Sequence, residues 1–275
     1  NVICKKLKIK STRPDLKSWK EMVKKATNTE FKEINLAFIA KYLDNTDTYM
    51  SVFEALRSAA MWNEAKVNIS WIDASKFDGK KSVETELEDY DGILVPGGFG
   101  QRGLEGKIKA ATYAFNSKKP FLGICLGLQM AVIAVARNKG VKSATTFELD
   151  SKSRSQVIVT MQGQEDKQMT GGTMRLGDYT CELEKGSLAY KLYKKTTITE
   201  RHRHRGECNP AYVSKYNKWG IRATGINPEN NLVEVIEAVD HPFFIASQYH
   251  PEFKSRPTKP HPLFEGLIRA MLKDK

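Results

Sequence analysis

A cysteine at a tight strand-to-helix turn is the residue of this sequence best suited to covalent chemistry. Cys125 is the centre of the segment Gly-Ile-Cys-Leu-Gly (123–127), between an apolar run typical of a buried strand and a segment with helical periodicity. Glycines on both sides permit the sharp turn of a nucleophile elbow. The thiol would face a helix N-terminus, whose partial positive charge favours the thiolate. We therefore predict that Cys125 is a nucleophile, the alternative being a small buried structural residue.

A nucleophilic thiol needs a base and a group that orients the base. His250 and Glu252 follow the apolar segment 244–249. If that segment is a strand parallel to the one before Cys125, the histidine lies at the same sheet edge as the thiol. We then predict that His250 holds the proton and that Glu252 fixes the tautomer of its ring.

A glycine-rich loop supplies candidate donors for an oxyanion. The segment 96–100 (Pro-Gly-Gly-Phe-Gly) follows a predicted strand, and we expect the backbone N–H groups of Gly98 and Leu126 to point at the reacting carbon. The segment 98–103 also matches Gly-x-Gly-x-x-Gly, which is typical of dinucleotide binding. That pattern requires an acidic residue at the end of the next strand. Here the next strand ends in Cys125, so the sequence favours the oxyanion loop.

The run Arg-His-Arg-His-Arg (201–205) has three interpretations. In a strand, both histidines lie on one face and the three arginines on the other. A zinc site would need further ligands at suitable spacing, and because none occurs nearby we predict no metal site. A phosphate or nucleic-acid patch stays open. A clamp for the carboxylate of a small substrate suits a cysteine site better, because arginine binds carboxylates in bidentate geometry.

Short apolar strands alternate with helices from residue 34, which is typical of a parallel sheet covered on both faces. The predicted elements of this part are strands at 34–40, 67–72, 92–95 and 120–124 and helices at 49–62, 103–116 and 126–138. After residue 150 the pattern is rich in strands of antiparallel appearance, at 156–161, 173–183, 197–203, 220–225, 232–238 and 244–249, with a polar loop at 162–170 and a closing helix at 262–272. We predict an α/β fold: an open, mostly parallel sheet flanked by helices, with an antiparallel strand-rich insertion in the second half.

Composition excludes several classes of function. The net charge is +12, and half of this excess lies in residues 1–33, with ten Lys or Arg against four Asp or Glu. Trp19 is the only aromatic residue among the first thirty, so we expect a basic tether and no nucleic-acid partner. No apolar run approaches the ~20 residues that span a bilayer, so no membrane partner is expected. Four cysteines make no disulfide framework, which favours the cytoplasm.

Taken together, these motifs resemble the class I glutamine amidotransferases, whose fold is flavodoxin-like, and more narrowly the glutaminase domain of the CTP synthase family. The resemblance runs from about residue 34 to the end of the sequence. Four segments carry it: PGGFGQRGLEGK (96–107), GGTMRLG (171–177), ERHRHR (200–205) and HPEFKSRPTKPHPLF (250–264). Residues 1–33 resemble the last strand of the synthase half and the inter-domain linker, so we expect a boundary that separates them from an amidotransferase domain at 34–275.

The resemblance implies an activity and a role for each site residue. Cys125 attacks the glutamine amide, His250 protonates the departing ammonia with Glu252 as its orienter, and water hydrolyses the thioester to glutamate. Gly98 and Leu126 supply the oxyanion N–H groups. The implied substrate-binding residues include Gly97, Phe99 against the glutamine side chain, Gln129 at its amino-acid end and Arg205 at its carboxylate.

The resemblance also implies partners outside this sequence. Ammonia passes to the synthase (amidoligase) half, a carbon–nitrogen ligase of pyrimidine biosynthesis that binds ATP, Mg and UTP and makes CTP, while GTP is an allosteric activator. We expect no cofactor in the glutaminase domain itself, and no Gly-x-x-x-x-Gly-Lys-Ser/Thr loop occurs in this sequence. A homo-oligomer, a tetramer built through the synthase half, is implied for the full-length enzyme.

One segment departs from the family pattern. The family has Ser-Thr-Glu-Phe after the elbow helix, and its Glu binds the substrate ammonium, whereas this sequence has Ala-Thr-Thr-Phe (144–147) with Thr146 in that place. Glu148 lies two residues on, about 6–7 Å further along an extended chain. We predict that Glu148 substitutes in part and that glutamine binds more weakly. The departure also leaves open a degenerate binding module, while a peptidase or γ-glutamyl hydrolase is disfavoured by the segments above.

Overall fold

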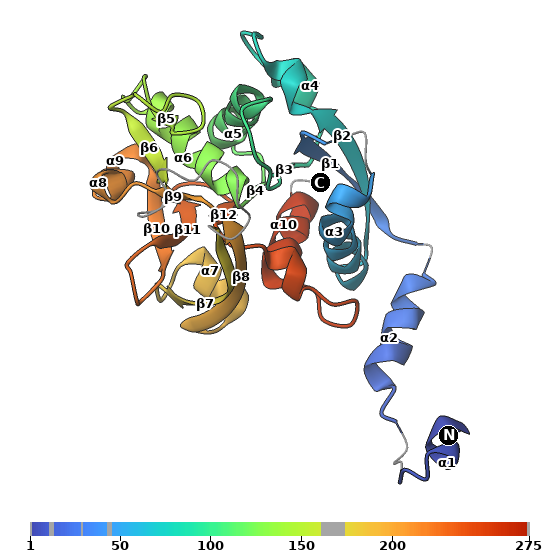
Figure 1. The fold of residues 1–275 in the computed structure, drawn as a ribbon. Coiled ribbons are helices and arrows are strands. Elements are labelled where there is room, and N and C mark those ends of the chain that lie inside the picture. The colour runs from blue at the N-terminus through green and yellow to red at the C-terminus, as the bar shows by residue number, and fades with distance from the viewer. Residues whose placement is uncertain (1, 11–13, 29, 43–45, 161–173, 274–275) are drawn as a thin grey trace.

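The computed structural model describes residues 2–10, 14–28, 30–42, 46–160 and 174–273. Its centre is a nine-stranded sheet with helices on both faces (Figure 1). In spatial order the strands are β2 (Ala65–Asp73), β1 (Lys32–Ala40), β3 (Gly92–Val95), β4 (Phe121–Ile124), β12 (Phe244–Ser247), β11 (Val233–Ala238), β10 (Ile221–Ile226), β7 (Arg175–Leu183) and β8 (Thr197–His204). The predicted α/β fold is confirmed.

The first five strands of this order are parallel to one another. Every residue of β3, β4 and β12 is buried, which explains why these strands appear in the sequence as continuous apolar runs rather than as alternating patterns. The order 2-1-3-4-12 is the flavodoxin-like arrangement, in which ligands bind at the carboxyl ends of the strands.

Two helical layers cover the sheet. The helices α3 (Met50–Trp62) and α10 (Pro262–Lys273) pack on one face, and α5 (Leu104–Ser117) and α6 (Leu126–Asn138) pack on the other. Alternate strand residues point to opposite layers, so Phe38 packs with the first pair of helices and Ile39 with the second. Eleven of the thirteen residues of α6 are buried, as expected of a helix that is apolar on all sides.

The strands after residue 150 form no separate unit. The antiparallel strands β11, β10, β7 and β8 extend the main sheet, and a small second sheet combines β5 (Thr145–Thr146), β6 (Gln156–Thr160) and β9 (Gly206–Cys208). The strand predicted at 244–249 pairs in parallel with β4 and antiparallel with β11. The predicted polar loop at 162–170 and the residues 171–173 of the GGTMRLG segment lie outside the described residues.

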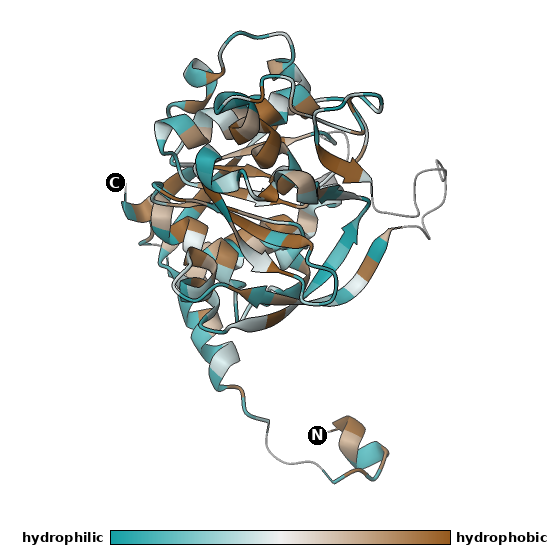
Figure 2. Ribbon diagram, turned by 90° about the vertical axis from the view of Figure 1, so that its left-hand side faces the viewer, coloured by the Kyte–Doolittle hydropathy of each residue, from teal (hydrophilic) through white to brown (hydrophobic). Residues whose placement is uncertain are grey.

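The segment that precedes β1 was expected to contain a strand, but its described residues form two helices. Residues Val2–Lys6 form a short helix, α1, with no buried residue, and a second helix, α2 (Lys17–Ala26), follows. A strand needs a partner for its backbone groups, and no described strand pairs with this segment, so local bonds such as Leu7 N–H to the Ile3 carbonyl satisfy them instead. Figure 2 shows α1 standing apart from the body of the molecule.

Several short elements had no clear sequence signal. They are η1 (Thr46–Tyr49), η2 (Ala74–Phe77), α4 (Glu84–Leu87), α7 (Leu188–Tyr193), α8 (Pro210–Val213), α9 (Tyr216–Trp219) and η4 (Pro251–Lys254). Across the described ranges no helix combines the length and apolar character needed to cross a bilayer.

The close approach of α5 to η2 generates a stability prediction. A Cβ at Gly106 would overlap the carbonyl oxygen of Ala74, so Gly106→Ala should cost at least about 3 kcal/mol. Gly186 has φ +85° in open space, so Gly186→Ala should cost about 1 kcal/mol, for backbone strain alone. Urea unfolding of both variants measures the difference. Equal losses would contradict the proposed overlap.

Candidate active site

The carboxyl ends of three neighbouring parallel strands bring the predicted chemical groups together. The loop Pro96–Gly98 leaves β3, Cys125 leaves β4, and His250 follows β12. Ser247 of β12 is in register with Ile124 of β4, and the backbone N–H of Cys125 donates to the Ser247 carbonyl oxygen over 2.7 Å. The three segments therefore meet at one edge of the sheet.

The cysteine occupies a strained elbow. Cys125 has φ +55° and ψ −103°, a conformation that costs of order 1–3 kcal/mol for a residue with a side chain. A Cβ at Gly123 would lie 2.8 Å from the backbone of Gly127, and one at Gly127 would overlap the Val95 carbonyl oxygen. Only glycines fit on either side of the turn, as the elbow motif predicts. The elbow starts α6, so the Cys125 side chain lies at the helix N-terminus.

His250 and Glu252 form the orienting pair. The Nδ1 atom of His250 lies 2.7 Å from Oε1 of Glu252, so Nδ1–H donates to the carboxylate and Nε2 stays available for the thiol. The imidazole stacks on Phe253, with ring centroids 5.1 Å apart. A Cβ at Gly97 would lie 3.1 Å from Cε1 of His250 and 3.6 Å from Cβ of Cys125, so the two side chains flank this glycine together.

Charge keeps the imidazole protonated. Burial by itself would lower the pKa of His250, but the negative charges of Glu252 and Cys125 outweigh it and raise that pKa well above its usual range. The arrangement suits a thiolate–imidazolium pair, in which the proton needed by a leaving group is already on the base.

Two buried lysines hold the glycine-rich loop 96–100. Lys107, wholly buried in α5, donates from Nζ to the Pro96 carbonyl oxygen over 2.9 Å. Lys41 donates to the carbonyl oxygens of Phe99 and Gly100, and burial lowers its pKa to about 8. With carbonyls of the loop bound on the protein side, the N–H groups of its glycines are free to face the site. Sequence reasoning missed both lysines; Lys41 follows a run of apolar residues, whereas Lys107 lies between Glu105 and Lys109 and has no such signal.

Two of the residues predicted to bind the substrate, Arg205 and Glu148, lie near the loop 96–100. The guanidinium of Arg205 lies 5.9 Å from the Phe99 ring. Burial raises the pKa of Glu148, while the positive charges of Lys41 and Arg205 and the N–H of Gly100 counteract that rise. The side chain of Glu148 thus lies in the field of two cations, as a substitute for a missing carboxylate requires.

Two further predicted positions are buried next to this group. Nε2 of Gln129, one turn into α6, donates to the Gly206 carbonyl oxygen over 3.0 Å. Thr146 is buried at 1% exposure, and its hydroxyl accepts from the Glu148 N–H. The three predicted catalytic residues and the loop 96–100 meet at the ends of β3, β4 and β12, and Arg205 and Glu148 lie near that loop at Phe99 and Gly100.

A cavity of about 270 Å³ opens onto the nucleophile. Its size suits a small metabolite rather than a large ligand. Arg203, which no motif had singled out from its neighbours, lines it together with Tyr42, Tyr49, Gly97, Gly98, Phe99, Cys125, His250, Glu252 and Phe253. The predicted substrate-binding residues Gln129, Glu148 and Arg205 are not part of its lining.

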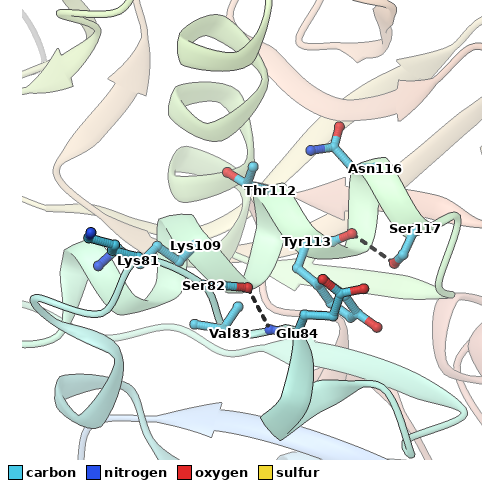
Figure 3. Close-up of a pocket in the computed structure, with 9 residues that line it drawn as sticks. All are labelled: Lys81, Ser82, Val83, Glu84, Lys109, Thr112, Tyr113, Asn116 and Ser117. Atoms are coloured by element: carbon cyan, nitrogen blue, oxygen red, sulfur yellow. Dashed lines mark hydrogen bonds between the residues drawn. The ribbon is translucent and has the colours of Figure 1, made fainter.

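A larger cavity lies elsewhere, beside α4 and α5 (Figure 3). It has about 430 Å³ and no thiol or imidazole in its lining. Its polar groups are partly engaged locally, since the Ser117 hydroxyl donates to the Tyr113 carbonyl oxygen and the Glu84 N–H donates to the Ser82 hydroxyl. Size alone therefore does not identify the reactive site.

The alternation predicted for the segment 201–205 is confirmed. In β8 the two histidines are buried and Arg201 and Arg203 are exposed. Nδ1 of His202 lies 2.8 Å from Nε2 of His204, so the nitrogens that a metal would need bind each other. Within the described residues, no group of three or more metal-binding side chains is arranged to hold an ion.

Comparisons with known proteins agree on one family. The sequence profile "Glutamine amidotransferase class-I" matches residues 45–270. The chain is 47% identical over 271 residues to the CTP synthase of Caldanaerobacter subterraneus, covering 98% of this chain and 50% of that protein. It is 48% identical over 270 residues to the CTP synthase of Cytophaga hutchinsonii, with the same two coverages. The chain spans about half the length of these curated relatives.

A solved structure of a glutaminase domain has a similar fold. The glutaminase domain of Trypanosoma brucei CTPS with bound acivicin superposes with a TM-score of 0.81 at 35% sequence identity. The match covers 87% of this chain and 94% of that domain.

The His250–Glu252 pair generates a prediction about protonation. Glu252→Gln removes the negative charge that contributes to raising the pKa of His250, so that pKa should fall. Loss of a charge-assisted hydrogen bond of roughly 1.5–3 kcal/mol should also slow alkylation of Cys125 at pH 7 by about 10- to 150-fold. Proton NMR of His250 across pH and iodoacetamide kinetics are the measurements. Glu54→Gln, an exposed carboxylate on α3, is the control; equal behaviour of the two variants would contradict the assignment.

Proposed function

Because the chain belongs to the class-I glutamine amidotransferase family, we propose that its Cys125 hydrolyses glutamine and that the ammonia formed serves the synthesis of CTP. The observation that carries the catalytic assignment is the meeting of Cys125, His250 and Glu252 at one sheet edge through the parallel pairing of β12 with β4.

The chemistry proceeds in two stages. The Cys125 thiolate attacks the amide carbon of glutamine, and the resulting oxyanion accepts hydrogen bonds from the N–H groups of Gly98 and Leu126. As the C–N bond breaks, His250 gives its proton to the leaving nitrogen, which departs as ammonia and leaves a thioester. His250 then takes a proton from water, whose oxygen attacks the thioester. Glutamate leaves and the thiolate is restored.

The neighbouring group of side chains suits the amino-acid end of glutamine. Arg205 supplies a fork of donors for the α-carboxylate, and Glu148 supplies a negative charge for the ammonium. The Phe99 ring packs against the methylene groups, with Gly97 leaving room for the reacting amide. Gln129 lies beside this end through its bond to Gly206.

The whole enzyme is part of the same proposal. Since this chain spans half the length of the CTP synthases it resembles, residues 34–275 would be the glutaminase domain and residues 1–33 would connect it to a synthase half. That half would bind ATP, Mg and UTP and would build a tetramer, with GTP as activator. A cytoplasmic location, favoured by the cysteine content, belongs to this proposal.

A covalent labelling experiment tests the glutaminase assignment without depending on turnover. A diazo- or chloroketone analogue of glutamine should form a single adduct at Cys125, mapped by peptide mass spectrometry, and excess glutamine should prevent it. Cys125→Ser is the control and should take no label there. Labelling that glutamine does not block would mean a different substrate. Absence of label on the folded protein would favour a binding module without glutaminase chemistry.

The proposed role of Glu148, which is to bind the ammonium group of glutamine, gives a second prediction. Glu148→Ala should raise the glutamine concentration that halves the labelling rate by about 10- to 150-fold, because a charge-assisted contact of roughly 1.5–3 kcal/mol is lost. Thr146→Glu, which places a carboxylate where the family pattern has one, should lower that concentration. If Glu148→Ala binds glutamine like the unmodified protein, Glu148 does not act as the substitute.

A further inference from the structure

A cluster of four polar side chains lies beside the segment that carries His250. Its members are Tyr193 at the end of α7, Glu200 of β8, Tyr249 directly before His250, and His261 directly before α10. Glu200, Tyr249 and His261 are at most 4% exposed. The glutaminase chemistry proposed above uses none of the four.

Oε1 of Glu200 is the acceptor at the centre of the cluster. The Tyr193 hydroxyl donates to it over 3.1 Å, and Nε2 of His261 lies 3.0 Å from it. The Leu263 N–H donates to Nδ1 of His261 over 3.3 Å, so Nδ1 carries no proton and Nε2–H points at the carboxylate. Nε2 also lies 3.0 Å from the Tyr193 oxygen, so the carboxylate and its two donors are in mutual contact.

The cluster continues from Tyr193 to Tyr249. Their hydroxyl oxygens are 3.0 Å apart. Burial raises the pKa of both hydroxyls well above the ordinary value, so both keep their protons. Since the Tyr193 proton is given to Glu200, Tyr249 is the donor of this bond. Glu200 thus accepts directly from His261 and, through Tyr193, holds Tyr249.

These contacts join the two ends of the segment 249–261. Between the ends, neighbouring backbone carbonyls of β8 bind the same segment. The His250 N–H donates to the Arg201 carbonyl oxygen over 2.8 Å. Nζ of Lys254 donates to the Thr199 carbonyl oxygen over 2.6 Å. Three consecutive residues of β8 therefore hold the segment at its start, its middle and its end.

The imidazole of His250 depends on such support. The pairing of β12 with β4 ends at Ser247, three residues before it. At His250 the backbone has φ −106° and ψ 88°, outside the range of a regular strand. Displacement of a reacting group by about 1 Å can cost about 100-fold in rate. The contacts that fix the segment 249–261 therefore bear on the chemistry.

We propose that Glu200 is a positioning residue for the catalytic base. Through Tyr193 and His261 it clamps both ends of the segment 249–261 and so holds the imidazole of His250 at the nucleophile. The role of His250 as a base belongs to the proposed function, so the inference rests on it. The side chains predicted to bind the amino-acid end of glutamine lie outside the clamped segment, so the clamp should act on reactivity and not on glutamine affinity.

Tyr193→Phe tests the clamp by removal of a single oxygen. It leaves the hydroxyl of Tyr249 without its acceptor, so the tie between the catalytic segment and Glu200 is lost. Alkylation of Cys125 by iodoacetamide at pH 7 should slow by about three- to tenfold, where tenfold corresponds to one hydrogen bond of about 1.4 kcal/mol. Tyr190→Phe, the same change on the same helix but outside the cluster, is the control and should react like the unmodified chain.

Two further readouts separate positioning from a merely structural role. With a ketone analogue of glutamine as the label, the maximal labelling rate should fall by the same factor in Tyr193→Phe, while the glutamine concentration that halves labelling should stay within about twofold. In proton NMR the pKa of His250 should fall, because the imidazole spends less time beside the negative charge of Cys125. Loss of stability in urea without these changes, or equal slowing in Tyr190→Phe, would overturn the proposal.

Two changes at Glu200 test rescue by a conservative variant. Glu200→Gln keeps an acceptor oxygen for Tyr193 and His261, so Cys125 should react within about threefold of the unmodified rate. Glu200→Met has similar length and no oxygen acceptor, so it should slow the reaction at least as much as Tyr193→Phe. Equal rates for the two changes at Glu200 would contradict the clamp, and if Glu200→Met does not fold, Tyr193→Phe decides.

Failure of the proposed function would be recognised separately. Iodoacetamide kinetics and the NMR of His250 require no glutamine. If glutamine does not block the ketone label while Tyr193→Phe still slows iodoacetamide, the clamp holds and the proposed substrate is wrong. If glutamine blocks the label and Tyr193→Phe reacts like the unmodified chain, the substrate holds and the clamp is wrong.

Discussion

Parallel hydrogen bonding of β12 to β4 is the constraint on which the site depends. It places the residue after Ile124 and the residues after Ser247 at the same edge of the sheet, and the Cys125 N–H bonded to the Ser247 carbonyl ties the two segments together. If β12 ran the other way, His250 would leave at the opposite edge, about four strand residues distant. The elbow geometry, the His250–Glu252 pair and the cavity all presuppose this pairing.

Several charged side chains are buried near the reactive edge. Lys107 and Lys41 bind carbonyl oxygens of the loop 96–100, and Arg175 pairs with Glu234 over 2.7 Å. Such groups are poor contributors to stability, because their desolvation offsets much of the attraction between them. They fix the orientation of backbone carbonyls and N–H groups instead, which is what stabilisation of a developing oxyanion requires.

The N-terminal segment differs from the rest of the chain in the exposure of its apolar side chains. Val2, Ile3, Leu7 and Trp19 are all exposed. Contiguous exposed apolar groups mark contact sites. Together with the half-length match to the CTP synthases, they support the proposal that this segment meets a synthase half.

Short sequence patterns determined the features of the protein that depend only on residues close together in the chain. The glycines around Cys125, the apolar runs of β3 and β4 and the mostly apolar helix α6 act over a few residues, so the elbow and the parallel core could be predicted. The alternation in β8 likewise set its histidines apart from its arginines. Tertiary structure alone decided the direction of β12, the burial of Lys107 and the ion pair between Arg175 and Glu234. Each of these depends on segments far apart in the chain, whose pairing no short window of sequence contains. The N-terminal segment illustrates the same limit, because part of it was expected to be a strand and Val2–Lys6 forms a helix with no described strand beside it.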